Sequence, residues 1–229
     1  MAAVSRRNPA TFKNRIKSSY PTLVNLGILI SGRGSNMDAI LSTVQAGRIR
    51  NVKPCVVISN KADAAGLKIA SEKYRVPTEV VPAEGLKGWD YDQKIVAALQ
   101  KHDVLPQAGL VCLAGFMRII SPEFVRAYKM RILNIHPALL PSFPGLHAQK
   151  LALDYGVKVT GCTVHFVDEE IDSGPVILQK PVPVLEGDTE ETLSARILEQ
   201  EHQLYPEAVR LFADGRLKVD GRVVAIAPG

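Results

Sequence analysis

Asn134 and His136 are the residues whose types and spacing best suit chemistry. They lie two positions apart, where an apolar run over 130–135 meets the proline-rich loop that follows. Alternate residues of a strand point to the same face, so both side chains should project together from a strand end. An Asn amide donates to an oxygen that gains negative charge, and a His donates or moves protons. By itself the pattern fits a stiff structural loop equally well.

A carboxylate to pair with His136 is available in the segment DEEIDSGPV (168–176). Asp172 precedes a Ser-Gly-Pro turn that can point its side chain across a cleft, whereas the preceding acids fit solvated positions in a turn. A buried Asp beside a His titrates together with it as a coupled pair. A serine nucleophile is not favoured, because neither Ser35 nor Ser173 follows a nucleophile-elbow pattern.

The glycine-rich segment ISGRGSN (30–36) lies between an apolar run and a helix pattern. Gly32 and Gly34 permit close backbone approach, Ser35 and Asn36 add donors, and the start of a helix favours an anion. A dinucleotide fingerprint is excluded because Met37 stands where its third glycine would be. A P-loop is excluded because the segment lacks the GK[ST] that a P-loop has before its helix. Two interpretations stay open here: a tight turn with a cap, or a site for a phosphate monoester.

Apolar runs and helix patterns alternate along the first part of the chain. Strands are expected at 22–30, 52–59, 77–81, 109–115 and 130–135, and helices at 36–45, 63–73, 90–101 and from 121–122 onward. This alternation predicts an α/β fold with an open, mainly parallel twisted sheet and helices on both faces.

The pattern changes after residue 156. Residues 157–167 and 175–184 read as neighbouring strands that extend the sheet. Asp188 and Glu191 resemble a capping box at the start of a long helix that runs to about residue 213. Asp220-Gly221 lies between short apolar runs, which is typical of a terminal hairpin.

The charge distribution suggests a basic N-terminal extension at 1–21 followed by one domain at 22–229. The net charge is +5, and residues 1–20 hold five basic residues and no acid, so the body is near neutral. We therefore expect no nucleic-acid partner. No apolar run reaches the ~18 residues that span a bilayer, so no membrane partner is expected either. A flexible extension is favoured over a transit peptide, because the segment is short and contains prolines.

The three cysteines, Cys55, Cys112 and Cys162, show no metal-ligand spacing, and no other cluster predicts a metal site. Cys55 and Cys112 lie in apolar runs, where a buried structural thiol is the default. The odd number of cysteines without a secretion signal fits the reducing cytoplasm.

Taken together, the segments resemble the phosphoribosylglycinamide formyltransferase family, the folate-dependent enzymes of purine synthesis. The matching segments occur in the family's order and are ISGRGSN (30–36), SNKADAAGL (59–67), LAGFMRIISP (113–122), LNIHPALLPSFPG (133–145), TVHFVDEEIDSGPVILQ (163–179) and QEHQLYP (200–206). The resemblance implies a Rossmann-like formyltransferase fold. One departure is Ala138, where many relatives carry Ser.

The resemblance also implies roles for individual residues. Asn134, His136 and Asp172 match the catalytic trio, and His165 matches a histidine that supports the site from behind. The implied ligands of the substrate phosphate and ribose are Gly32, Gly34, Ser35, Asn36 and Glu201. The implied folate site comprises Met117, Arg118, Ile119, Ile120, Asn134, Val167, Asp168, Glu169, Glu170, Ile171 and Asp172, with His147 as a further candidate.

The implied reaction moves a formyl group from the co-substrate 10-formyltetrahydrofolate to the amine of glycinamide ribonucleotide, in a monomer or a homodimer. A formyltetrahydrofolate deformylase shares this chemistry, but it usually has an N-terminal regulatory domain that the short extension cannot form. A methionyl-tRNA formyltransferase needs a further C-terminal domain, whereas the strands and helix after His136 use most of the remaining chain. A non-catalytic phosphate-binding module would not require Asn134, His136 and Asp172 together.

Overall fold

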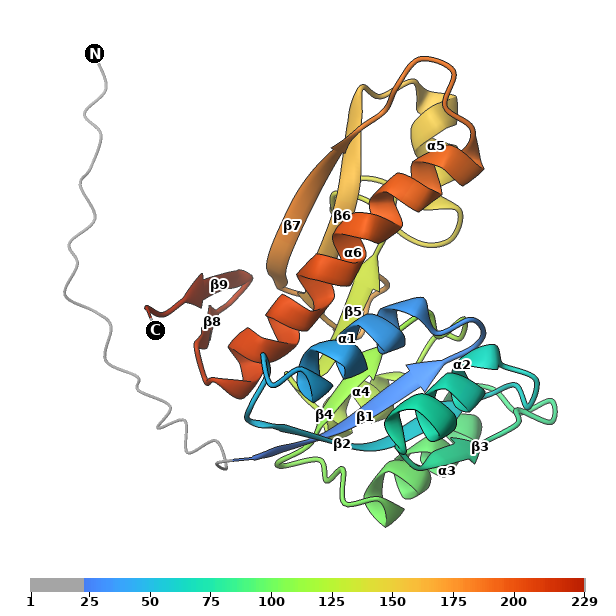
Figure 1. The fold of residues 1–229 in the computed structure, drawn as a ribbon, viewed down its shortest axis with the longest axis vertical. Helices are drawn as coiled ribbons and strands as arrows, with labels where there is room; N and C mark the ends of the chain where they lie inside the picture. The colour runs from blue at the N-terminus through green and yellow to red at the C-terminus, as the bar shows by residue number, and fades with distance from the viewer. Residues whose placement is uncertain (1–22, 229) are drawn as a thin grey trace.

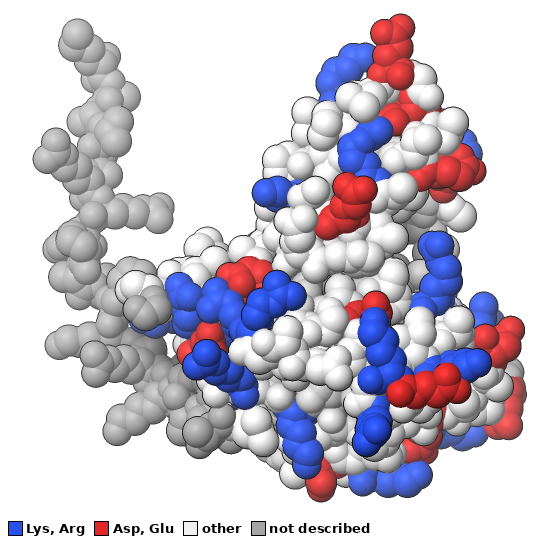
Figure 2. Space-filling model, viewed as in Figure 1, with Lys and Arg blue, Asp and Glu red and all other residues white. Residues whose placement is uncertain are grey.

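The computed structural model describes residues 23–228 (Figure 1). The predicted N-terminal extension at 1–21 lies outside the described residues. Within residues 23–228, no helix combines the length and the apolar character needed to cross a membrane. Acidic and basic side chains lie among one another on the face shown in Figure 2, in keeping with the near-neutral body expected from the sequence.

A seven-stranded sheet forms the centre of the structure, in the order β3-β2-β1-β4-β5-β6-β7. The pairs from β3 to β5 are parallel, and β6 and β7 add two antiparallel pairs at one edge. This arrangement confirms the expected open, mainly parallel sheet and the two strands that extend it. The strands are β1 (Val24–Ile30), β2 (Val52–Ser59), β3 (Thr78–Val80), β4 (Leu110–Leu113), β5 (Ile132–His136), β6 (Val159–Phe166) and β7 (Val176–Pro183).

Helices cover both faces of the sheet, as expected. The apolar side chains of α1 (Ser35–Gln45), α2 (Ala65–Lys68) and α6 (Glu190–Ala213) share one buried cluster. Those of α3 (Gly88–Lys101) and α4 (Pro122–Ala127) share a second cluster against the opposite face. Because apolar residues line the strands on both faces, the sheet contributes to both clusters.

One local expectation was wrong, and two elements differ from the sequence-based description. The helix expected at 63–73 is present as α2 followed directly by a π-helical turn, η1 (Ile69–Lys73). The capping box of α6 uses Thr189 and Thr192 in place of Asp188 and Glu191, and Asp188 pairs instead with Arg196 at 2.7 Å. The helix α5 (Ala148–Tyr155) was not anticipated; it spans only eight residues after a proline-rich loop, and it buries only Ala148 and Ala152.

The antiparallel strands have two local features. The predicted terminal hairpin is present as β8 (Leu217–Asp220) and β9 (Val223–Ile226). In β7, the pairing with β6 moves from Val164↔Leu178 to His165↔Val176, so Ile177 is an extra residue. This one-residue β-bulge lies just after the loop that carries Asp172.

Candidate active site

The carboxyl end of β5 brings Asn134, His136 and Asp172 together. Asn134 is half-buried and His136 is buried, with 4% of its surface exposed. Asp172 comes from the loop before β7, and its two carboxylate oxygens contact the two β5 side chains separately. Oδ1 accepts a hydrogen bond from Asn134 Nδ2 at 3.4 Å, and Oδ2 lies 3.2 Å from His136 Nδ1.

The loop holds Asp172 in a demanding conformation. Its φ is 48°, in the left-handed region that few non-glycine residues adopt. Close packing follows immediately, because a Cβ added to Gly174 would lie 1.8 Å from the carbonyl oxygen of Phe166. A residue with a side chain at 174 would therefore push the Asp172 turn away from the sheet.

Asp172 is stabilised in its ionised form. Burial alone would raise the pKa of Asp172, but the hydrogen bonds from His165 and from the Gly145 amide, with the charges of His136 and His165, outweigh it. The pKa of Asp172 is therefore below its usual value of 3.8. The Gly145 N–H donates to Oδ2 at 2.8 Å, which anchors the carboxylate to the loop after β5.

Both ring nitrogens of His136 face oxygen atoms. Nε2 lies 2.8 Å from the carbonyl oxygen of Phe143, which can only accept, so Nε2–H is the donor. Nδ1 faces Asp172, and because that oxygen is ionised, the contact is favourable only when Nδ1 also carries a proton. Burial lowers the pKa of His136 from its ordinary 6.5, against the opposing charge of Asp172. A protonated His136 beside Asp172 therefore releases its Nδ1 proton more readily than a solvent-exposed His–Asp pair would.

His165 on β6 holds the amide of Asn134. The two residues are directly paired across β5 and β6. His165 Nδ1 lies 2.8 Å from the carbonyl oxygen of Phe166, so Nδ1–H donates, and Nε2 lies 3.2 Å from Asn134 Nδ2 and 3.6 Å from Asp172 Oδ1. In the neutral ring Nε2 accepts from Asn134, and in the protonated ring Nε2–H donates toward Asp172. These contacts hold the Asn134 amide in place, and the supporting role of His165 in the reaction stays a prediction.

The residues predicted to bind the substrate phosphate and ribose also come together. Gly34, with φ 74°, precedes α1, and its close neighbour is the α-carbon of Gly66. Asn36 in the first turn of α1 donates from Nδ2 to Glu201 Oε2 on α6 at 2.7 Å, and both residues are buried. Burial raises the pKa of Glu201 above 4.5, although the Asn36 hydrogen bond acts in the opposite direction.

The two predicted folate segments present exposed apolar side chains. Met117 and Ile119 are 66% and 74% exposed, and Ile171 of the second segment is 55% exposed, whereas Ile120 is buried. Arg118 is held in place, because its guanidinium stacks 4.2 Å from the Tyr91 ring. The folate contacts of both segments stay predictions.

Other predicted residues have surface positions. In the second segment, Asp168, Glu169 and Glu170 are exposed, and Glu169 pairs with Arg126 at 3.0 Å. His147 is exposed and precedes α5, so its contact with a folate remains a prediction.

Sequence reasoning missed Ser31, which connects the two halves of the candidate site. Its hydroxyl donates to Asn60 Oδ1 at 2.6 Å and accepts from the Met117 backbone N–H at 2.8 Å. Ser31 thus links the glycine-rich loop to the first folate segment. Its position directly after a buried strand was the only available signal.

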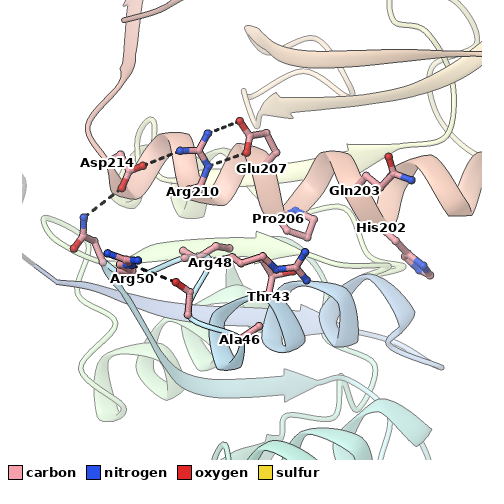
Figure 3. Close-up of a pocket in the computed structure, with 13 residues that line it drawn as sticks. Thr43, Ala46, Arg48, Arg50, His202, Gln203, Pro206, Glu207, Arg210 and Asp214 are labelled. Atoms are coloured by element: carbon pink, nitrogen blue, oxygen red, sulfur yellow. Dashed lines mark hydrogen bonds and ion pairs between the residues drawn. The ribbon is translucent and has the colours of Figure 1, made fainter. Parts of the chain in front are cut away.

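A groove of about 980 Å³ lies between the C-terminal end of α1 and α6 (Figure 3). Three of its charged side chains pair with one another, since Arg210 lies 2.7 Å from Glu207 and 3.2 Å from Asp214. Asn134, His136 and Asp172 do not line it. Among residues 23–228, no group of three or more His, Cys, Asp and Glu side chains is arranged to hold a metal ion.

Comparisons with known proteins agree with this geometry. The sequence matches the family described as formyl transferase over residues 24–209. It is 44% identical over 197 residues to phosphoribosylglycinamide formyltransferase of Escherichia coli strain K12, covering 86% of this chain and 90% of that protein. It is 46% identical over 217 residues to the trifunctional purine biosynthetic protein adenosine-3 of Bos taurus, covering 93% of this chain but only 21% of that protein.

Solved structures give the same result. Glycinamide ribonucleotide transformylase 1 from Symbiobacterium toebii superposes with a TM-score of 0.85 and 48% identity, covering 90% of this chain and 95% of that one. A formyltetrahydrofolate deformylase from Pseudomonas syringae superposes with a TM-score of 0.81 but only 26% identity, and the match covers 90% of this chain and 66% of the deformylase. The fold, the site at the end of β5 and the match over residues 24–209 place the chain in the formyl transferase family.

Proposed function

We propose that this protein transfers the formyl group of 10-formyltetrahydrofolate to the amine of glycinamide ribonucleotide in purine biosynthesis. The observation that carries the proposal is the contact of one carboxylate, Asp172, with both Asn134 and His136 at the end of β5. The similarity to phosphoribosylglycinamide formyltransferase of Escherichia coli over 86% of the chain supports the choice of substrates.

The reaction is the attack of an amine on an amide-like carbonyl carbon. A bond forms between the amine nitrogen and the formyl carbon, and the formyl oxygen becomes negatively charged in a tetrahedral intermediate. The bond from that carbon to the folate nitrogen then breaks. The amine must lose a proton and the departing folate nitrogen must gain one, so the site needs an oxyanion donor and a proton carrier.

The site residues match these needs. In the ligand-free protein Asn134 Nδ2 lies 3.2 Å from His165 Nε2 and 3.4 Å from Asp172 Oδ1. In the proposal, one of its two hydrogens turns from these contacts to the formyl oxygen when the substrates bind. His136 in its protonated form contributes positive charge and a proton, and Asp172 orients it and accepts the proton of the attacking amine. Because Asp172 is ionised and anchored by Gly145, the pair can exchange a proton without moving far.

The substrates occupy opposite sides of this trio in the proposal. Gly32, Gly34, Ser35 and Asn36 receive the phosphate where free N–H groups begin α1, and Glu201 accepts from the ribose hydroxyls. The folate lies against 117–120 and 167–172, whose exposed apolar side chains suit a planar ring. We also propose a cytoplasmic location, because Cys55, Cys112 and Cys162 are buried free thiols.

Absorbance spectroscopy with 10-formyltetrahydrofolate tests the proposal. The purified protein is mixed with the folate, with and without glycinamide ribonucleotide, and the deformylated folate is followed. Product that forms only with the ribonucleotide supports a transferase. Product without the ribonucleotide would show that the same trio activates water, as in a deformylase, and no product in either mixture would refute both activities.

A further inference from the structure

We propose that Gln179 on β7 is a positioning residue for the His136–Asp172 pair, although it lies two strands from His136. This role of Gln179 extends the proposed function, and its kinetic test rests on that function. The register of the sheet brings the residues together. His136 of β5 is paired with Thr163 of β6, and Thr163 is paired with Gln179 of β7. These three residues form one transverse row, here called the His136 row.

The middle member of the row, Thr163, is fully buried and its hydroxyl is saturated. It donates to the Ala138 carbonyl oxygen at 2.7 Å, and it accepts from the Leu140 N–H at 3.1 Å and from Gln179 Nε2 at 3.0 Å. A hydroxyl has one hydrogen to donate and two lone pairs, so all three are used. The hydroxyl orientation therefore depends on the Gln179 hydrogen bond.

Gln179 contributes a second bond from the same nitrogen. Its Nε2 also donates to the Leu140 carbonyl oxygen at 2.8 Å. Residue Leu140 is thus held at both its N–H and its carbonyl, once by Thr163 and once by Gln179. Gln179 lies near the exposed edge of the sheet, yet both of its amide hydrogens are directed inward to this loop.

The loop that is held in this way carries the backbone partners of the catalytic pair. Just beyond Leu140, the Phe143 carbonyl accepts from His136 Nε2 at 2.8 Å, and the Gly145 N–H donates to Asp172 at 2.8 Å. These two contacts decide which nitrogen of His136 faces Asp172. Loss of the Gln179 bonds should loosen the loop, and the ring of His136 should then sample other orientations.

The test compares Gln179→Met with Lys180→Met. Methionine has nearly the length of glutamine but no N–H donor, and Lys180 is the neighbouring exposed residue of the same edge strand. For Gln179→Met we expect kcat for formyl transfer to fall about tenfold, because misplaced reacting groups cost rate steeply, while both KM values change less than about twofold. Lys180→Met should match the wild type.

Two further readouts separate positioning from general destabilisation. In ligand-free protein, nitrogen-15 NMR of the histidine side chains should show an altered His136 signal in Gln179→Met only. The ionisable side chains that face His136 are Asp172 and His165. In an Asp172→Asn background, Gln179→Met should lower kcat by less than about twofold, because its effect passes through the His136–Asp172 pair.

The possible outcomes test the role of Gln179 and the proposed formyl-transfer function separately. An unchanged His136 signal with unchanged kcat would overturn the role of Gln179, and so would an equal loss of kcat in Lys180→Met. If the wild-type protein transfers no formyl group to glycinamide ribonucleotide, the proposed function fails. The NMR comparison then still tests the positioning of His136 by Gln179 independently.

Discussion

Removing the hydroxyl of Tyr205 should both destabilise the fold and slow the reaction. Tyr205 extends from α6 into the core, where it is completely buried. Its hydroxyl lies 2.8 Å from the carbonyl oxygen of Leu133, the second residue of β5, and 3.1 Å from that of Leu113, the last residue of β4. Burial holds the pKa of Tyr205 well above 10.0, so the hydroxyl remains a donor. Leu133 directly precedes Asn134, which places this bond next to the catalytic strand end.

The magnitude can be worked out from the groups that Tyr205→Phe leaves behind. A buried carbonyl that loses its donor typically costs about 1–3 kcal/mol in the free energy of unfolding. For a protein of this size, about 1 kcal/mol corresponds to a shift in Tm of roughly 2–4 °C, so a decrease of roughly 2–12 °C is expected. A small displacement of Asn134 should lower kcat by about threefold to tenfold, since a shift of ~1 Å costs ~10².

Tyr128→Phe is the matched control. Tyr128 is also fully buried, and its hydroxyl donates to the Val104 carbonyl oxygen at 2.6 Å, in the apolar cluster on the opposite face of the sheet from Tyr205. Both variants should lower Tm in a calorimetric scan, but only Tyr205→Phe should lower kcat in a formyl-transfer assay. Equal losses of kcat in the two variants, or a Tm of Tyr205→Phe within about 1 °C of the wild type, would refute the reasoning.

Three other perturbations test the site. Asn134→Ala should lower kcat by about 10²–10³ while the folate Kd changes little, and near-normal turnover would remove Asn134 from oxyanion stabilisation. Asp172→Asn removes a negative charge that raises the pKa of His136, so an NMR titration should give a pKa further below 6.5 than in the wild type, and an increase would contradict the pairing. Asn tolerates the φ of 48° at this position. Because the folded-state pKa of Glu201 is raised above 4.5, its ionisation costs stability as pH rises through that folded pKa. Glu201→Gln keeps a side-chain oxygen that accepts from Asn36, so the variant should have a higher Tm than the wild type at pH 7. This difference in Tm should shrink toward pH 4.5. Thermal melts across this pH range measure the difference, and a lower Tm of the variant at pH 7 would contradict the prediction.

Most of the fold could be predicted because its signals are local. The strands β1, β2, β4 and β5 are largely apolar runs bounded by turn residues, and such runs are typical of a sheet covered on both faces. The proximity of Asn134, His136 and the glycine-rich loop follows from the same rule, since parallel strands end at one edge. By contrast, α5 has only eight residues and buries only Ala148 and Ala152, so its short periodic pattern was not distinguished from the irregular loop before it.

The finer geometry of the site could not be predicted, because it depends on contacts between distant segments. The Phe143 carbonyl reaches His136 through an irregular loop whose backbone angles no local pattern specifies. The support of Asn134 by His165 requires the antiparallel register of β5 and β6, which only the assembled sheet determines. The link from Gln179 to Leu140 depends on that register and on the next pair of strands as well.

The extra residue Ile177 in β7 has a consequence for how the site is held in place. A bulge increases local twist and bends its strand, here where the chain emerges from the Asp172 loop. Deleting Ile177 would give β6 and β7 an uninterrupted ladder, which a sheet accepts readily, but it would reverse the faces of the residues between the bulge and the loop. Asp172 would then be displaced from His136, and the core would lose the buried side chain of Ile177. The bulge thus ties the position of the Asp172 carboxylate to the packing of one core residue.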